Sequence, residues 1–271
     1  MRVVMTLLVR DEDDVIGAHL GFHFAIGVDF VIATDNGSTD GTTDILEAHE
    51  RDGRLHLIRE PSDVSQEEQV TRMARLAATD FDADWVINGD ADEFWFPGNG
   101  TLEDLLAAMP LRVGRVRCSW SHFPPRPGDG FFAERMTARL CVPQPPRFHH
   151  QIKLVHRADP TVVVAGGNHN ASGKKLRRIT KDSPVDVLHF PLRSRAQFER
   201  KFLRWFEILP SLPARYQEVY DAHREGRLDE LWERYVLSDE ELERGLRAGT
   251  YAVDTRLADT LRQLHAAPIA R

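Results

Sequence analysis

The chain has 271 residues, of which 42% are hydrophobic, and a formal net charge of −7 at pH 7. The apolar fraction suffices for a sizeable buried core, whereas the negative charge argues against a non-specific nucleic-acid binder. No apolar run approaches the roughly 20 residues that cross a bilayer, and the first residues lack the pattern of a signal peptide. We therefore expect a soluble, cytoplasmic protein, and the sequence leaves peripheral membrane contact open.

The first part of the chain alternates between predicted strands and predicted helices. The strands cover residues 3–9, 30–33, 55–59 and 85–88. The helix before the fourth strand begins with the capping box Ser65-x-x-Glu68. Its predicted buried face consists of Val70, Met73, Ala74 and Ala77. Alternation of this kind predicts an α/β fold with a mainly parallel sheet flanked by helices.

The pattern changes after residue 110. Further strands are predicted at residues 113–120, 137–142, 150–156, 161–165 and 187–190. Some of these alternate in polarity, which is typical of the antiparallel part of a mixed sheet. Helical patterns dominate from about residue 196. The sequence therefore predicts an α/β domain, residues 1–192, followed by a C-terminal helical extension, residues 193–271.

Two features outside these elements bear on environment and surface. Cys118 and Cys141 lack a metal-ligand spacing such as Cys-x-x-Cys, and we interpret both as buried thiols in a reducing compartment. Lys and Arg residues cluster at residues 174–178 and 193–204. We interpret the first cluster as a solvated face.

The turn after the fourth predicted strand carries the most informative residues, Asp90 and Asp92. The Asp-x-Asp spacing occurs twice more in the chain, but only this copy directly follows an apolar strand. Open α/β sheets bind ligands at the carboxyl ends of their strands. Two carboxylates on a short turn suit Mg²⁺ or Mn²⁺, and either ion in turn suits a diphosphate.

Polar loops also follow the first and second predicted strands. They carry Arg10 and Glu12, and Asp35 and Asn36. Because the carboxyl ends of parallel strands share one edge of the sheet, we expect these loops beside the Asp90 turn. A nucleotide site needs such a convergence: Asp35 would accept hydrogen bonds from a base or ribose, and Asp90 would hold a ribose hydroxyl or the metal.

Three motifs in this order resemble the family-2 type of glycosyltransferase, and most closely its Asp-x-Asp-Glu-Phe branch. They start at Val9, Asp35 and Asp90, and read Val-Arg-Asp-Glu, Asp-Asn-Gly-Ser-Thr-Asp-Gly-Thr and Asp-Ala-Asp-Glu-Phe. A later segment that starts at His189, His-Phe-Pro-Leu-Arg-Ser, is similar to one seen in that branch. The resemblance covers about residues 1–110 and weakens beyond them.

The resemblance implies a GT-A (Rossmann-like) fold and hexosyltransferase-like activity. It further implies a nucleotide-diphosphate-sugar donor, first of all a UDP-sugar, a hydroxyl acceptor, a divalent metal (Mn²⁺ or Mg²⁺) and inversion at the anomeric carbon. Residues 1–192 would then bind the donor and catalyse transfer. Residues 193–271 would lie on the acceptor side or form a homodimer contact.

Transfer of a sugar requires charge stabilisation at the leaving diphosphate and a base for the acceptor hydroxyl. A metal held by Asp92 would stabilise the leaving group, and Arg193 and Lys201 are the candidate cations around the diphosphate. The candidates for the base are Glu93, beside the metal turn, and Glu134, in the region expected to face the acceptor.

Enzymes of this fold often add one late histidine to the metal shell. His169, in a glycine-rich loop, and His189, in the last predicted strand, are the candidates. Both also have an ordinary structural interpretation.

Two other classes of protein remain open. A nucleotidyltransferase that makes a nucleotide sugar also uses an Asp-bound metal. Its typical loop after the first strand is glycine-rich and basic, whereas residues 10–13 here read Arg-Asp-Glu-Asp, which contains three acids and no glycine. A non-catalytic binding module of the same fold is the second alternative. The intact pair Asp90 and Asp92 argues against it.

Overall fold

The computed structural model describes residues 1–60, 65–142, 152–177, 179–208 and 214–266. The elements up to residue 122 are β1 (Val3–Val9), α1 (Ile16–Ala25), β2 (Phe30–Asp35), α2 (Thr42–Arg51), β3 (Leu55–Arg59), α3 (Gln66–Thr79), β4 (Trp85–Gly89), β5 (Glu93–Phe96), α4 (Leu102–Ala107) and β6 (Val113–His122). The later strands are β7 (Ala138–Leu140), β8 (Ile152–Arg157), β9 (Val163–Val164), β10 (Ala171–Ser172), β11 (Ile179–His189) and β12 (Tyr251–Val253). The later helices are α5 (Phe132–Arg135), α6 (Arg195–Ile208), α7 (Ala214–Arg224), α8 (Leu228–Tyr235), α9 (Asp239–Ala248) and α10 (Arg256–Ala266), with short 3₁₀ turns η1 (Gly166–Asn168) and η2 (Lys175–Arg177).

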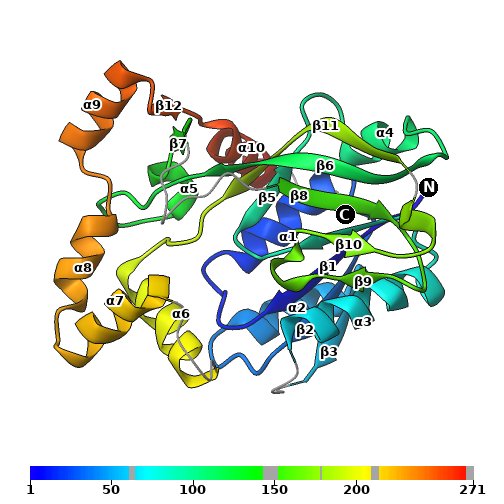
Figure 1. The fold of residues 1–271 in the computed structure, drawn as a ribbon, viewed down its shortest axis with the longest axis horizontal. Helices are drawn as coiled ribbons and strands as arrows, with labels where there is room; N and C mark the ends of the chain where they lie inside the picture. The colour runs from blue at the N-terminus through cyan, green and yellow to red at the C-terminus, as the bar shows by residue number, and fades with distance from the viewer. Residues whose placement is uncertain (61–64, 143–151, 178, 209–213, 267–271) are drawn as a thin grey trace. The chain divides into compact units, whose positions relative to one another are not determined.

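Eight strands form one mixed sheet in the order β3-β2-β1-β4-β8-β6-β11-β5 (Figure 1). The first four are parallel, and β8 is antiparallel to both β4 and β6. β1 is buried along almost its whole length, as its continuous apolar run predicts for a central strand. The predicted mixed α/β sheet flanked by helices, with helices at the end of the chain, is confirmed.

The chain divides into two compact units. The first comprises residues 1–120, 151–188 and 263–271, and the second comprises residues 121–150 and 189–262. The domain boundary predicted between residues 192 and 193 stays a prediction.

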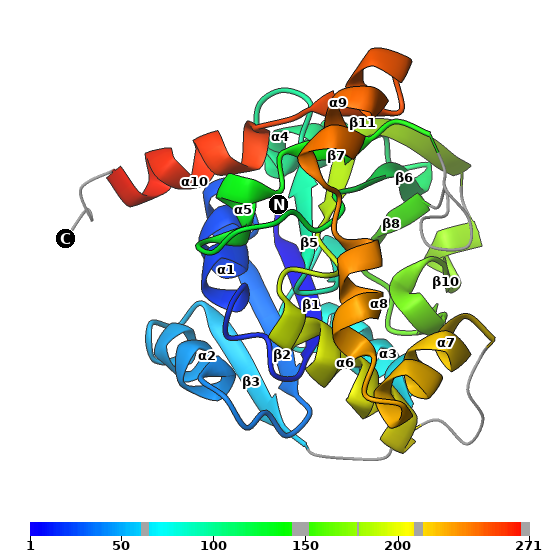
Figure 2. The same ribbon diagram turned by 90° about the vertical axis from the view of Figure 1, so that its left-hand side faces the viewer.

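In the first unit, helices cover both faces of the parallel strands. Figures 1 and 2 show α3 on one face and α1 with α2 on the other. The alternation of side chains along a strand explains this arrangement, because one apolar strand supplies two buried faces.

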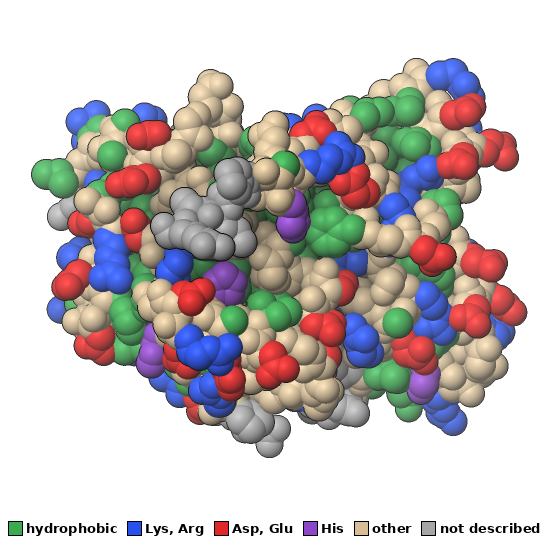
Figure 3. All heavy atoms as spheres, turned by 180° about the vertical axis from the view of Figure 1, so that it is seen from behind, with side chains coloured by type: hydrophobic (Ala, Val, Ile, Leu, Met, Phe, Trp, Pro, Cys, Tyr) green, Lys and Arg blue, Asp and Glu red, His purple; other side chains and the backbone are tan. Residues whose placement is uncertain are grey.

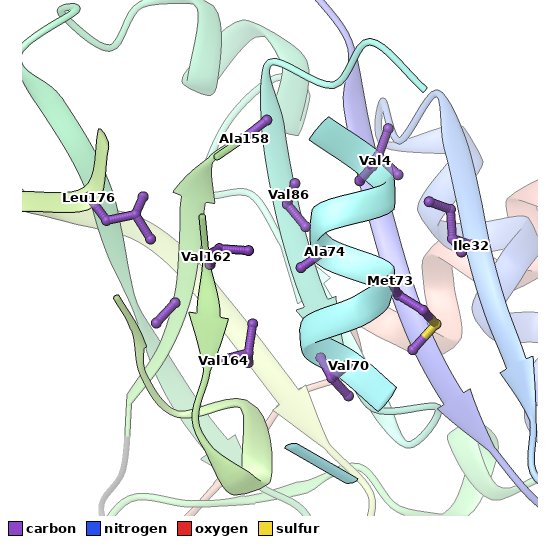
Figure 4. Packing of buried hydrophobic residues seen from close by; sticks show 12 residues of the cluster. Val4, Ile32, Val70, Met73, Ala74, Val86, Ala158, Val162, Val164 and Leu176 are labelled. Carbon is purple, nitrogen blue, oxygen red and sulfur yellow. The ribbon is translucent and has the colours of Figure 1, made fainter. Parts of the chain in front are cut away.

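Packing between α3 and the sheet forms a core that Figure 4 shows in close-up. Val4, Ile32 and Val86 come from three neighbouring strands and pack with Met73 of α3. The predicted buried face of the helix is confirmed, since all four of its residues are at most 2% exposed. At the start of α3, the hydroxyl of Ser65 accepts a hydrogen bond from the backbone N–H of Glu68, as predicted.

In the second unit, α6, α7 and α8 lie side by side (Figure 2), and their side chains form an apolar core. Its buried members are Leu192, Phe198, Phe202, Val219, Ala222, Leu228 and Leu231. The aromatic side chains of Trp232 and Tyr235 pack against Phe198 at ring distances of 5.4 Å. A short antiparallel pair, β7 with β12, completes this unit.

The surface agrees only in part with the sequence-based interpretation. On the face shown in Figure 3, acidic and basic side chains are interspersed. Cys118 is buried as predicted, but the prediction for Cys141 is wrong: it is exposed, just beyond the end of the short strand β7. No helix in the described part of the chain is both long and apolar enough to span a membrane.

Candidate functional site at the carboxyl ends of the strands

The loops after β1 and β2 lie side by side. Val9 pairs with Asp35 in the sheet register. Beyond it, the guanidinium of Arg10 donates to the carbonyl oxygen of Asn36 at 3.2 Å. The backbone N–H of Glu12 donates to the hydroxyl of Thr42 at 2.8 Å. The four residues predicted to form the nucleotide side of the site are therefore neighbours.

Asp35 holds the loop that follows it. Its carboxylate accepts hydrogen bonds from the backbone N–H of Ser38, at 2.8 Å, and from the hydroxyl of Thr43. The residue is only 4% exposed. An ionised carboxylate offers about four acceptor positions, so these two bonds leave capacity for hydrogen bonds from a ligand.

The Asp90 turn contains an ion-pair network that the sequence analysis did not identify. Lys153 of β8 has a fully buried side chain, and its ammonium lies 2.8 Å from Asp90 Oδ2 and 2.7 Å from Glu93 Oε1. It also donates to the carbonyl oxygen of Gly167 at 3.0 Å. The amide of Asn168 donates to Asp90 Oδ1 at 2.9 Å. One internal ammonium therefore contacts two of the three carboxyl groups at this turn.

Burial and charge act in opposite directions in this network. Burial raises the pKa of Glu93 to about 8, although Lys153 lowers it. Burial lowers the pKa of Lys153, but the carboxylates of Asp90 and Glu93 raise it above its ordinary value. The lysine is therefore charged.

His19 of α1 lies beneath the turn and is fully buried. Burial lowers its pKa to about 3, although the nearby carboxylate of Asp92 raises it, so the imidazole is neutral. Its ring contacts the rings of His23 and Phe94 at 4.1 Å and 5.7 Å. Asp92 itself is 5% exposed. The Asp90 turn is therefore packed against uncharged ring side chains.

The donor set at the turn is suited to a metal that is shared with a diphosphate. Among the described residues, no group of three or more His, Cys, Asp or Glu side chains could hold a metal ion. Mg²⁺ is usually bound by one or two carboxylates together with substrate phosphates. Asp90 and Asp92 fit that pattern, and Asp90 retains acceptor positions beside its two hydrogen bonds.

His169 follows Asn168 in the first unit. Its Nδ1 lies 3.1 Å from the carbonyl oxygen of Ile152, and its ring packs on Trp120 at 5.2 Å. The structure thus places it on the loop that contacts Asp90.

The remaining predicted site residues belong to the second unit. Glu134 forms an ion pair with Arg262, with Oε1 at 2.8 Å from Nε. His189 Nδ1 lies 2.9 Å from Nδ1 of His122. Arg193 is buried and donates to the carbonyl oxygen of Phe190 at 3.2 Å. Lys201 donates to the carbonyl oxygen of Pro191 at 3.1 Å. Three of them therefore gather around residues 189–193.

Comparison with known sequences finds a family model that matches part of the chain. Residues 28–149 match the model of glycosyl transferase family 2. The matched segment is slightly less than half of the chain and includes both Asp35 and the Asp90 turn. No curated protein sequence matches significantly. The family match supports a transferase that uses a nucleotide sugar.

Solved structures resemble the chain only distantly. Residues 1–349 of S. aureus TarS share 13% identity at a TM-score of 0.47, over 75% of this chain and 65% of that one. Glucosyl-3-phosphoglycerate synthase from Mycobacterium tuberculosis, solved with Mn²⁺, UDP and glucosyl-3-phosphoglycerate, shares 19% identity at a TM-score of 0.33, over 44% of each chain. 4-Diphosphocytidyl-2C-methyl-D-erythritol synthase shares 13% identity at a TM-score of 0.35, over 58% of this chain and 75% of that one. The chain spans less than two-thirds of the first two structures, and likenesses this distant carry no functional argument.

Proposed function

We propose that the chain is a metal-dependent inverting glycosyltransferase that moves a hexosyl group from a nucleotide-diphosphate sugar, first of all a UDP-sugar, to an acceptor hydroxyl. One observation carries the proposal: the Asp90–Asp92 turn ends β4, whose neighbour β1 leads into the Arg10 loop, and β1 pairs in turn with β2, which ends at Asp35. The Asp35 loop and the Asp90 turn lie within the segment that matches a glycosyltransferase family.

The residues of the first unit have separate roles in the proposed reaction. Asp35 and Asn36 bind the nucleoside, with Arg10 fixing the loop through its bond to the Asn36 carbonyl. Asp90 orients the ribose or shares the metal. Asp92 is the principal metal ligand. When bound, the metal supplies Lewis-acid stabilisation of the departing diphosphate.

The base is assigned to Glu134 rather than Glu93. Glu93 has no exposed surface and accepts from the backbone N–H of Asp90 at 3.3 Å, so it positions the turn. The side chain of Glu134 is 40% exposed and can accept a proton once its surface ion pair with Arg262 opens. Arg193 and Lys201 are proposed as cations for the diphosphate, and His189 and His169 as candidates for an additional metal ligand.

The decisive experiment compares two equivalent substitutions in separate Asp-x-Asp copies. We expect Asp92→Asn to reduce turnover of nucleotide sugar by at least a hundredfold, because the amide binds a divalent cation far more weakly than a carboxylate does. Asp82→Asn, in an exposed copy away from this strand end, should retain activity. Release of UDP with Mn²⁺, measured over a panel of nucleotide sugars, is the readout.

Three results would contradict the proposal: full activity of Asp92→Asn, full activity in excess EDTA, or no turnover and no thermal shift with any nucleotide sugar. Release of pyrophosphate from a nucleoside triphosphate and a sugar phosphate would instead support the nucleotidyltransferase alternative. The cytoplasmic location and the homodimer contact stay predictions.

A further inference from the structure

A cavity lies in the first unit, away from the carboxyl ends of the parallel strands. Its volume is about 360 Å³, and it is lined by Arg115, Thr161, Ser172, Gly173, Lys174, Leu176 and Arg177. In the register, Arg115 pairs with His156, and the neighbouring Arg157 pairs with Trp85 at the start of β4. Asp90 follows the end of β4, so the cavity is separate from the candidate donor site. We call it the basic pocket.

Three cationic side chains line the basic pocket, and no acidic partner for them lies among the described residues. No ion pair to Arg115, Lys174 or Arg177 is present within the described part of the chain, although many other arginines there are paired. Acidic and basic side chains are otherwise interspersed, as Figure 3 shows for one face. The lining of the pocket thus contains three cationic side chains and no carboxylate.

Arg115 lines the basic pocket with a guanidinium that is held in place on one side. Its Nη1 donates to the carbonyl oxygen of Ala171 at 3.3 Å, which fixes the guanidinium against β10. Its Nε is buried and has no hydrogen-bond partner among the described residues. The guanidinium therefore has donors beyond the one that bonds to Ala171.

The loop that carries Lys174 is built around a buried acid that does not line the pocket. Asp159 is 1% exposed and accepts from the backbone N–H of Thr161 and of Lys175, at 2.8 and 2.6 Å. A Cβ on Gly173 would lie 2.7 Å from the Asp159 carboxylate, so a larger residue does not fit there. The local sequence thus holds the Ser172–Lys174 backbone in a fixed position beside the cations.

We propose that the basic pocket binds a phosphate group, as a monoester or a diester. The guanidinium forks of Arg115 and Arg177 match phosphate oxygens, Lys174 adds a point charge, and the hydroxyls of Thr161 and Ser172 add neutral donors. The cavity volume lies within the range of about 300–1,000 Å³ found for small-molecule sites. The phosphate belongs either to a soluble phosphorylated compound or to a phospholipid head group. This proposal does not depend on the proposed transferase activity.

The first arm of the test titrates the isotopically labelled protein with inorganic phosphate at constant ionic strength, with chloride as the reference anion. We expect saturable shifts of the backbone amide resonances of residues 172–174, which separates this pocket from phosphate binding at the donor site. In Lys174→Glu/Arg177→Glu the affinity should fall at least tenfold. Both residues are exposed, so the fold should survive.

The second arm measures cosedimentation with vesicles of phosphatidylcholine, with and without phosphatidylglycerol. The matched control is Arg244→Glu/Arg247→Glu on α9, which changes the net charge equally and should bind like the wild type. Arg115→Lys, which keeps the charge but loses the fork, should also weaken binding.

Each outcome of the two arms either supports or overturns the proposed phosphate site. Binding of phosphate that the pocket variant loses and the control keeps supports the pocket with a soluble source, and binding restricted to anionic vesicles with the same variant pattern supports it with a lipid source. The proposal is overturned if neither probe binds, if the control loses binding equally, or if neutral vesicles bind as well as anionic ones.

Discussion

At the scale of single residues, the candidate site depends on Lys153. The sequence shows this lysine between Ile152 and Leu154, a charge within an apolar strand, and that was the available signal. Its partners Asp90 and Glu93 lie some 60 residues earlier in the chain, so spacing could not identify them. Asp90 and Asp92 themselves were predictable, because the turn follows its strand directly.

Removing the charge at Lys153 tests this network. We expect Lys153→Met to lower the free energy of unfolding by about 3–5 kcal/mol, the usual cost of leaving buried charge unpaired. Lys153→Arg should lower the free energy of unfolding by less than Lys153→Met does. The double variant Lys153→Met/Glu93→Gln should be more stable than Lys153→Met alone. Urea unfolding measures all three, with Lys181→Met on the exposed part of β11 as the control. A stability of Lys153→Met equal to that of the control would contradict the network.

At the scale of elements, the regular β-α alternation of the first part was predictable, and the later strands were less so. β11 covers Ile179–His189, whereas the sequence predicted only residues 187–190. Its first half is largely exposed, and Pro184 lacks a backbone donor, so neither polarity nor hydrogen bonding marks it as a strand. β5 was missed for a similar reason, because four residues next to a polar turn give no periodicity.

Two helical glycines give a prediction at this scale, because their surroundings differ. A Cβ at Gly245 in α9 would lie 2.3 Å from the Tyr251 ring, whereas nothing lies within 4 Å of one at Gly21 in α1. We expect Gly21→Ala to stabilise the protein by up to about 1 kcal/mol through helix propensity. Gly245→Ala should destabilise it by about 1–3 kcal/mol through overpacking. Urea unfolding of the two variants measures this, and shifts of the same sign would contradict it.

At the scale of the whole molecule, stability should depend on buried neutral histidines. Burial lowers the pKa of His156 from 6.5 to about 4. Its Nδ1 donates to the carbonyl oxygen of Arg157, at 2.9 Å, and its Nε2 accepts from the amide of Asn88, also at 2.9 Å. The amide oxygen of Asn88 accepts from Thr6 at 2.8 Å. This chain of bonds across β8, β4 and β1 requires the neutral ring.

The sign of the pH dependence follows from these values. The unfolded chain takes up the proton near pH 6.5, but the folded one only near pH 4, so protonation favours unfolding. The stabilisation is complete above about pH 6.5 and is lost as the pH falls towards 4, by about 3 kcal/mol for His156 alone. His19, with a pKa of about 3, acts in the same direction.

Urea unfolding at a series of pH values, from neutral down to the folded-state pKa of His156, measures this dependence. His156→Gln should show a shallower decline than the wild type. His223→Gln, at an exposed position, should show the wild-type decline. An unchanged decline in His156→Gln would contradict the assignment.

The sequence by itself determined the α/β class, the parallel strands and the position of the Asp90 turn, because hydrophobic periodicity and turn residues act over a few neighbouring positions. Only the tertiary structure decided which charged side chains come together: Lys153 with Asp90 and Glu93, and the three cations that line the basic pocket. These contacts join segments that are distant in the chain, and their energies depend on burial, which cannot be predicted from a local sequence pattern.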